Sequence, residues 1–174
     1  MKATVRKATL DDLEILIKFT AEEAREAESI KKVPSTLEKG IKAALQDNSK
    51  SIYWVIMDEN NTPFGNISAL KEWSDWNAGY YWWIQSMYIY PKHRGKGYIQ
   101  LLLAAVQEEM KKENGLELRL YVHKSNKKAI KAYEKVGFKK SDYEVMKKTR
   151  ESVSPNSLKQ AGEPPNKHNN GITC

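Results

Sequence analysis

A strand-like segment that turns directly into a helix constrains this chain more than any other feature. Aromatic residues are frequent over residues 80–90, and an apolar helical pattern runs from Gly97 to Leu103. The turn between them reads Arg94-Gly95-Lys96-Gly97. The first turn of a helix leaves backbone N–H groups without intrahelical acceptors and carries the positive end of the helix dipole. The turn therefore predicts a binding site for a phosphate group.

The two glycines of this turn suit a pyrophosphate. Without bulky side chains at Gly95 and Gly97, the backbone can approach the anion closely, and both residues can adopt positive φ. The turn is not a P-loop, because the Gly-Lys-Ser/Thr ending is missing, and it lacks the third glycine of the dinucleotide-binding motif. It indicates a phosphate cradle of another kind.

Two motifs, in the right order and spacing, resemble the signature of the GCN5-related N-acetyltransferase (GNAT) superfamily. The first is Arg94-Gly95-Lys96-Gly97-Tyr98-Ile99, in which Ile99 replaces the small residue usual at that position. The second lies within residues 120–138 and is similar to the pattern L-x-V-x-x-x-N-x-x-A-x-x-x-Y-x-x-x-G-F. The resemblance covers residues 3–147. It implies an α+β fold with a mixed, mostly antiparallel sheet flanked by helices and with splayed central parallel strands.

The resemblance also implies where acetyl-CoA, the acetyl donor, binds. Its diphosphate would lie on the N–H groups of residues 95–99, and its pantetheine along the strand edge at residues 87–89. An N–H in that edge would stabilise the charge that develops on the acetyl oxygen. Asn126 matches the superfamily's cofactor-contacting asparagine, and its position also suits a helix cap. The expected cofactor-binding residues are Met87, Tyr88, Ile89, Arg94, Gly95, Lys96, Gly97, Tyr98, Ile99 and Asn126.

The expected catalytic residues are Tyr133 and Glu72. Tyr133 matches the tyrosine of the second motif, and its phenol could protonate the leaving thiolate; packing of the ring on the sheet is the alternative. Superfamily members that act on polyamines carry an acid where this chain has Gln85-Ser86, so the base must lie elsewhere. Glu72 is our candidate, and the open alternatives are Asp75, Glu22, Glu23, Glu26 and His123.

Aromatic residues before the glycine turn suit a cationic acceptor, through cation–π contacts beside acids. The alternative is ordinary core packing. Strict alternation along the strand would place Tyr80, Trp82, Ile84 and Ser86 on one face and Tyr81, Trp83, Gln85 and Met87 on the other. The expected acceptor-binding residues are Glu22, Glu23, Trp73, Asp75 and Gln85.

Length and composition fit one domain over residues 1–148, which the resemblance implies is an acetyltransferase domain, followed by a disordered polar tail over residues 149–174. The net charge of +7 does not favour nucleic acid as the ligand, because the basic residues form no concentrated stripe. We expect no membrane span, no signal peptide and a cytoplasmic location. The one cysteine, Cys174, allows no internal disulfide and no cysteine-based metal site, and we expect no metal.

The hydrophobic pattern predicts strands at residues 3–7, 52–57, 64–72, 80–90 and 116–122, and a last strand that includes Val145 and Met146. Helices are expected over residues 12–28, 35–45, 97–112 and 126–136, with Gly137 ending the last one.

The sequence therefore predicts an N-acetyltransferase that moves the acetyl group of acetyl-CoA to a primary amine by direct attack in a ternary complex. The acceptor is expected to be small, such as a polyamine or an amino-acid-like compound. A protein lysine or N-terminal acetyltransferase and a non-catalytic acyl-CoA-binding regulatory module are the alternatives. The oligomeric state, a homodimer included, is left open.

Overall fold

The computed structural model describes residues 2–29 and 31–148. Residues 1–139 form one compact unit, and residues 140–174 are assigned to a second. The first unit holds the five strands β1 (Thr4–Lys7), β2 (Ile52–Met57), β3 (Pro63–Ser74), β4 (Gly79–Ile89) and β5 (Glu117–Leu120). Its helices are α1 (Leu13–Glu28), α2 (Pro34–Gln46), α3 (Tyr98–Lys112) and α4 (Lys127–Lys135), with the 3-10 turns η1 (Leu10–Asp12) and η2 (Pro91–His93).

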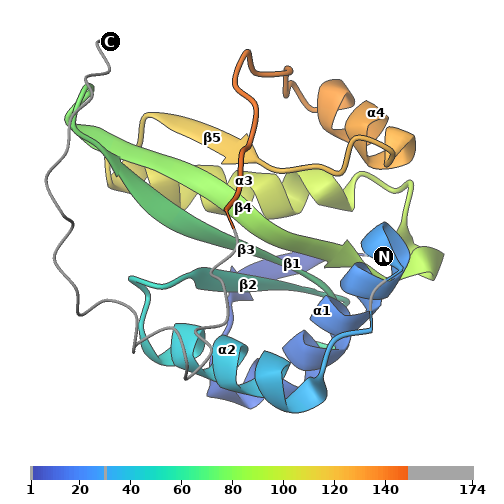
Figure 1. Cartoon of the computed structure of the whole chain (residues 1–174). Helices are drawn as coiled ribbons and strands as arrows, with labels where there is room; N and C mark the ends of the chain where they lie inside the picture. Colours follow the sequence, from blue (N-terminus) through green and yellow to red (C-terminus); the bar gives the residue numbers. More distant parts are fainter. Residues whose placement is uncertain (1, 30, 149–174) are drawn as a thin grey trace, which may run out of the picture. The chain divides into compact units, whose positions relative to one another are not determined.

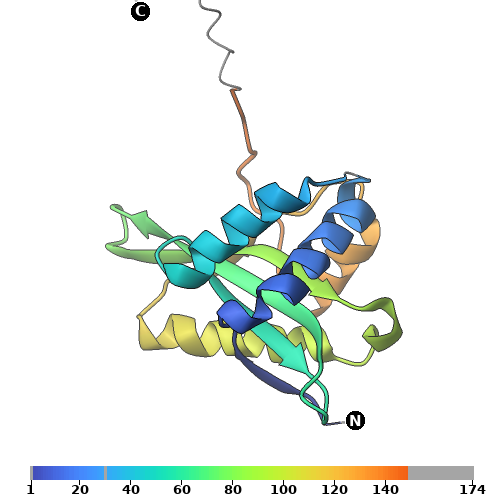
Figure 2. The same ribbon diagram turned by 90° about the horizontal axis from the view of Figure 1, so that it is seen from below.

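The strands form one mixed sheet in the order β1-β2-β3-β4-β5. The pairs from β1 to β4 are antiparallel, and β4 pairs with β5 in parallel. Helices α1 and α2 cover one face of the sheet and α3 covers the other, while α4 follows the end of β5 (Figures 1 and 2). The expected α+β fold, with a mostly antiparallel mixed sheet flanked by helices, is confirmed.

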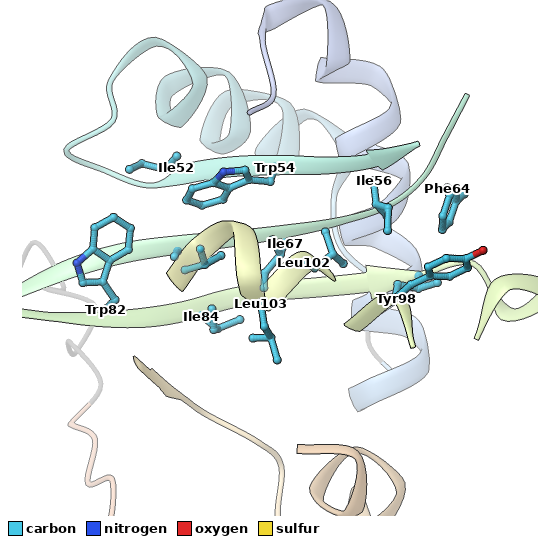
Figure 3. Close-up of a cluster of buried hydrophobic side chains, with 13 residues drawn as sticks. Ile52, Trp54, Ile56, Phe64, Ile67, Trp82, Ile84, Tyr98, Leu102 and Leu103 are labelled. Carbon is cyan, nitrogen blue, oxygen red and sulfur yellow. The ribbon is translucent and has the colours of Figure 1, made fainter. Parts of the chain in front are cut away.

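The hydrophobic core has a part on each face of the sheet. On one face, Leu102, Leu103 and Val106 of α3 pack on residues of β2, β3 and β4 that include Trp82 and Ile84 (Figure 3). On the other face, Leu16 and Phe19 of α1 and Ile41 and Ala44 of α2 pack on Tyr53, Val55, Met57 and Tyr88. The sheet thus separates two helical layers, and the alternation of β2 between them explains why every residue of β2 is buried.

A β-bulge in β4 changes which side chains share a face. Ser68 pairs with Ser86 while the next residue of β3, Ala69, pairs with Ile84, so Gln85 is the extra residue. Before the bulge, Trp82 and Ile84 face α3, whereas after it Ser86 contacts Ser68 on the α1 side. Met87 therefore packs against the α3-side core with Trp82 and Ile84. The predicted strict alternation over residues 80–87 is wrong for this reason.

The helices and strands lie within a few residues of their expected positions, apart from the last expected strand. The strand expected at Val145 and Met146 is wrong, because residues 138–148 contain no strand and both side chains are exposed. Two apolar residues between charged neighbours offer little surface to bury, and a strand forms only where a neighbour supplies its hydrogen bonds. The expected tail over residues 149–174 lies outside the described residues. In the part of the chain that the structure describes, no helix is long and apolar enough to cross a membrane.

Candidate active site

The glycine turn has the backbone geometry that the sequence suggested. Gly95 and Gly97 both have positive φ, +75° and +81°, and Gly97 is the N-cap residue of α3. No side chain caps this helix end. A Cβ at Gly95 would meet no atom within 4 Å, and one at Gly97 would meet only Gln100 Oε1, at 3.6 Å. The start of α3 therefore carries no side-chain cap and has open space at both glycines, as an anion site at a helix N-terminus requires.

The side chains that open α3 are core residues. Tyr98 is buried, and its ring lies 5.0 Å from that of Phe64 (Figure 3). Ile99 packs against the same core from a partly buried position. Both residues hold the start of the helix against the sheet, so they can contribute to a phosphate site only through their backbone N–H groups. The larger residue at position 99 is accommodated by the core.

Arg94 connects the glycine turn to α1 and to the end of β4. Its Nε donates to the carbonyl oxygen of Ile89 at 2.7 Å, and its Nη2 lies 2.8 Å from Glu26 Oε2. The guanidinium carbon lies 5.3 Å from the centroid of the Tyr88 ring, and the Tyr88 hydroxyl donates to Glu26 at 3.3 Å. Burial, together with the charge of Glu26, raises the pKa of Tyr88 to about 12. Arg94 is therefore an anchoring residue of the turn.

The parallel strands separate where the sequence resemblance implied. Pairing between β4 and β5 ends at Ile84 and Leu120, whereas β4 continues to Ile89. Beyond this point the end of β4 runs between α1 and α4 (Figures 1 and 2). The Met87 N–H donates to Glu23 Oε1 of α1 at 2.9 Å. This amide is therefore bonded to a side chain and not to a neighbouring strand.

Helix α4 supplies Asn126 and Tyr133. The Asn126 side chain accepts the N–H of Ala129 at 3.0 Å, so its expected role as a helix cap is confirmed. The Tyr133 ring packs edge-on against Phe138 at 5.8 Å. Burial, and after it the negative charge of Glu23, raises the pKa of Tyr133 to about 12. The phenol thus stays protonated at neutral pH, and the carboxylate whose charge acts on it is the one that accepts the Met87 N–H.

A row of buried polar side chains lies on the α1 side of the bulge. Tyr53 of β2 forms a hydrogen bond with Ser68, whose hydroxyl lies 2.8 Å from that of Ser86. Asn66 donates to Ser86 at 3.3 Å. Burial raises the pKa of Tyr53, and the charge of Glu23 adds to this. The sequence pattern did not point to these residues, because inside buried strands a hydroxyl gives no signal of its own.

Glu72, the candidate base, lies beside the first half of β4, away from Met87. Glu72 accepts a hydrogen bond from Trp83 Nε1, and its strand partner is Tyr81. Tyr81 precedes Met87 by six residues, which corresponds to about 20 Å along a strand. The structure therefore does not bring Glu72 to Met87.

Two of the expected acceptor residues lie at the same far end of the sheet. Trp73 contacts Tyr80 on the face opposite Glu72, and Asp75 is exposed in the turn between β3 and β4. Gln85 is exposed at the bulge, much nearer Met87. His123 is exposed, and its Nδ1 lies 2.7 Å from the Ser125 hydroxyl.

The acids of α1 differ in what they bind. Glu22 pairs with Arg25 and Glu26 pairs with Arg94, whereas Glu23 accepts the Met87 amide. Positions 16, 19, 23 and 26 recur at helical spacing, so the partly buried Glu23 and the exposed Glu26 extend the line of positions that the buried Leu16 and Phe19 begin. Acidic residues in line with the apolar face of a helix are unusual, and this sequence pattern could have identified Glu23 and Glu26 as residues of the site.

Comparison with known proteins agrees with this arrangement. The sequence model of the "Acetyltransferase (GNAT) family" matches residues 14–138. A possible acetyltransferase from Clostridium difficile 630 is 33% identical, with a TM-score of 0.80, over 87% of this chain and all of its own. A predicted acetyltransferase from Clostridium acetobutylicum, solved with acetyl-CoA, is 22% identical with a TM-score of 0.70, over 84% of this chain and 96% of its own.

A third solved structure, AAC(6')-Iy in complex with the bisubstrate analog CoA-S-monomethyl-acetylneamine, has the same fold. It is 14% identical, with a TM-score of 0.73, over 86% of this chain and 99% of its own. None of the curated proteins matches the chain. The fold and the site define an α+β protein in which a glycine turn joins β4 to the uncapped start of α3. The chain belongs to the GNAT acetyltransferase family, and the resemblance found in its sequence is confirmed.

Proposed function

We propose that this protein transfers the acetyl group of acetyl-CoA to a primary amine by direct attack in a ternary complex. One observation carries the proposal: the uncapped start of α3 and the Met87 amide, which is bonded outside the sheet, lie on the same strand–turn–helix unit. The first can hold a diphosphate, and the second can hold an acyl carbonyl. The related structure solved with acetyl-CoA supports this choice of donor.

In this proposal the backbone binds the donor. The amides of residues 95–99 hold the diphosphate, with the exposed Lys96 beside them, and Arg94 keeps the turn in place against Ile89 and Glu26. The pantetheine follows the edge of β4 at residues 87–89, which β5 leaves unpaired. The Met87 N–H then donates to the acetyl oxygen, where negative charge develops as the amine attacks. Asn126 lies at the start of α4, where it would also contact the donor.

Tyr133 acts on the leaving group. The amine nitrogen forms a bond to the carbonyl carbon, the carbon–sulfur bond breaks, and the thiolate leaves with the electron pair. The Tyr133 hydroxyl donates a hydrogen bond to that thiolate. With a pKa of about 12, the phenol is a weaker acid than a thiol, so it stabilises the thiolate without having to become a phenolate itself.

We propose a small amine as the acceptor, of the polyamine or amino-acid-like class. The support is the acidic end of α1, where Glu22, Glu23 and Glu26 lie beside the end of β4, together with aromatic residues on the exposed part of that strand. A carboxylate-rich approach beside aromatic rings favours a compact cation. Glu72 and Asp75 lie too far along the sheet to touch the acetyl group, so we assign them to the outer part of the acceptor path. Trp73 lies on the face opposite Glu72 and outside this path.

An amine panel tests the proposal directly. The protein is incubated with acetyl-CoA and, separately, with polyamines, amino acids, lysine peptides and peptides with a free N-terminus, and the released thiol is followed. We expect the highest kcat/KM with a small diamine or polyamine. Peptides that exceed every small amine would favour the protein acetyltransferase instead. Binding of acetyl-CoA without thiol release for any amine would indicate a non-catalytic module.

A further inference from the structure

Glu23 of α1 lies beside the end of β4. It stands four residues after Phe19 and seven after Leu16, both fully buried, so it continues the stripe of α1 that faces the sheet. Its Oε1 accepts the Met87 N–H at 2.9 Å. An oxygen atom of this side chain thus lies at the amide to which we assign the acetyl oxygen of the donor.

Three elements bring further groups to this carboxylate. Burial is the main cause of the raised pKa values of Tyr53 on β2 and Tyr133 on α4, and the charge of Glu23 contributes to both. The charge of Glu23 therefore acts on one phenol from β2 and on one from α4, while its carboxylate accepts the Met87 amide of β4 directly. The titratable groups on which Glu23 acts are Tyr53 and Tyr133, and the charged cluster of Glu22, Glu26, Arg94 and Tyr88 lies next to it along α1 and β4.

One amide N–H cannot serve two strong acceptors at full strength. When the acetyl oxygen binds at Met87, the Glu23 carboxylate must leave that amide. The carboxylate stays attached to α1, so it remains close to the amide that it has left.

We propose that Glu23 is the general base of acetyl transfer and that its bond to the Met87 amide is its resting position, from which the acetyl oxygen of the donor displaces it. This inference rests on the proposed function. As the nitrogen–carbon bond forms, the protons on nitrogen become acidic, and Glu23 takes one of them. The thiolate departs within reach of Tyr133, and Glu23 later releases its proton to solvent. The sum is amine plus acetyl-CoA giving amide plus CoA, whose thiolate takes up one proton from solvent while Glu23 returns one to it.

The displacement makes a prediction for binding that is independent of turnover. In the parent protein, acetyl-CoA must break the bond between Glu23 and Met87, whereas CoA has no acetyl oxygen to place there. Glu23→Ala removes the competing acceptor, so acetyl-CoA should bind about three- to tenfold more tightly relative to CoA than it does to the parent. Calorimetry with both ligands measures this ratio, and any general effect of the lost charge on an anionic ligand cancels in it.

Kinetics test the base. Glu23→Gln should lower kcat/KM by about 10² to 10⁴ and should remove the acid limb of its pH profile, because no carboxylate is left to deprotonate. Glu23→Asp keeps the carboxylate and should retain part of the activity and the acid limb. Glu14→Gln is the matched control, since Glu14 is exposed on the same helix, and it should behave like the parent. Circular dichroism and thermal melts establish that each variant is folded.

The outcomes separate this inference from the proposed function. A parent that turns over amines, together with a Glu23→Gln variant that keeps most of its kcat and its acid limb, overturns the assignment of the base alone. An unchanged ratio of acetyl-CoA to CoA affinity in Glu23→Ala overturns the displacement. A parent that binds acetyl-CoA and acetylates no amine overturns the proposed function and, with it, the base.

Discussion

Arg94 and Glu26 form an ion pair, with 2.8 Å between Nη2 and Oε2, that ties the glycine turn to α1. The same guanidinium donates through Nε to the Ile89 carbonyl, at the last residue of β4. The Arg94 side chain therefore connects the glycine turn, the strand that carries Met87 and the helix that carries Glu23. The relative positions of the proposed acetyl and diphosphate sites depend on this contact.

The planar guanidinium geometry of Arg94 should matter more for acetyl-CoA binding than its charge. Lysine has one nitrogen at the end of a flexible chain, so it cannot hold Ile89 and Glu26 in the same geometry. We expect Arg94→Lys to weaken acetyl-CoA binding about tenfold, close to the effect of Arg94→Gln. Lys92→Gln removes a charge two residues away in η2 and should change affinity far less. Calorimetry at two salt concentrations measures the acetyl-CoA affinity of each variant. An affinity of Arg94→Lys equal to that of the parent would mean that only the positive charge is required.

Gly97 should resist substitution because of its backbone conformation and not because of local crowding. Its φ of +81° disfavours every L side chain, although a Cβ would meet only Gln100 Oε1, at 3.6 Å. We expect the loss of acetyl-CoA affinity to increase from Gly97→Asn through Gly97→Ala to Gly97→Val, since asparagine tolerates the left-handed region best and branched residues worst. A folded Gly97→Val variant that binds acetyl-CoA as tightly as the parent would contradict the assignment of the glycine turn as the diphosphate site.

Gly40 is the matched control for Gly97, because its backbone conformation permits a side chain. It lies inside α2, its φ is not positive, and a Cβ there would meet no atom within 4 Å. Gly40→Ala should therefore stabilise the protein by about 0.5–1 kcal/mol through helix propensity. Denaturant unfolding measures the change in the free energy of unfolding, and acetyl-CoA affinity should stay at the parent value.

Loss of the Tyr133 hydroxyl should affect chemistry and not donor binding. Tyr133→Phe keeps the ring that packs against Phe138 and removes the hydrogen bond to the leaving thiolate. We expect kcat to fall by about 10² to 10⁴ while the Kd for acetyl-CoA changes little. Steady-state kinetics and calorimetry on the same preparation separate the two effects. A variant that keeps most of its kcat would leave Tyr133 with a packing role only.

The raised pKa of Tyr133 also predicts a loss of stability in alkali. Burial favours the neutral phenol, so its pKa is about 12 in the folded protein and close to 10 in the unfolded chain. This contribution to folding is complete below pH 10 and declines as the pH rises from 10 to about 12. The free energy of unfolding should therefore fall over this range, and the fall should be smaller in Tyr133→Phe. Denaturant melts at successive pH values, with phenolate absorbance, measure both.

Local patterns predicted most of the fold, because periodicity and end signals identify helices and strands one at a time. The bulge at Gln85 is different: it depends on how β3 pairs with β4, and nothing in the alternation of β4 marks it. It changes the face of Ser86 and Met87, and so it turns the Ser86 hydroxyl toward Ser68. The strand expected at Val145 failed for a similar reason, since a strand requires a partner that local sequence cannot supply.

The candidate site was predictable where the backbone carries it and less so where side chains from distant segments meet. Gly95 and Gly97 identified the turn by residue type alone. The pairing of Arg94 with Glu26, 68 positions earlier, required the packing of α1 beside β4. Glu23 was among the expected acceptor residues and the open candidates for the base, but only its contact with Met87 distinguishes it from Glu22.

Glu72 should influence long acceptors and leave short ones unaffected. It accepts a hydrogen bond from Trp83, and its strand partner Tyr81 precedes Met87 by about 20 Å of strand, so only an extended polyamine could reach it while its far amine is acetylated. Glu72→Gln should lower kcat/KM for such a polyamine about three- to tenfold, less at high salt because the charge is exposed and screened, and should not change kcat/KM for a short monoamine. Glu38→Gln on α2 serves as the charge control. Equal losses for long and short amines in steady-state assays would show that Glu72 acts through the fold and not through the acceptor.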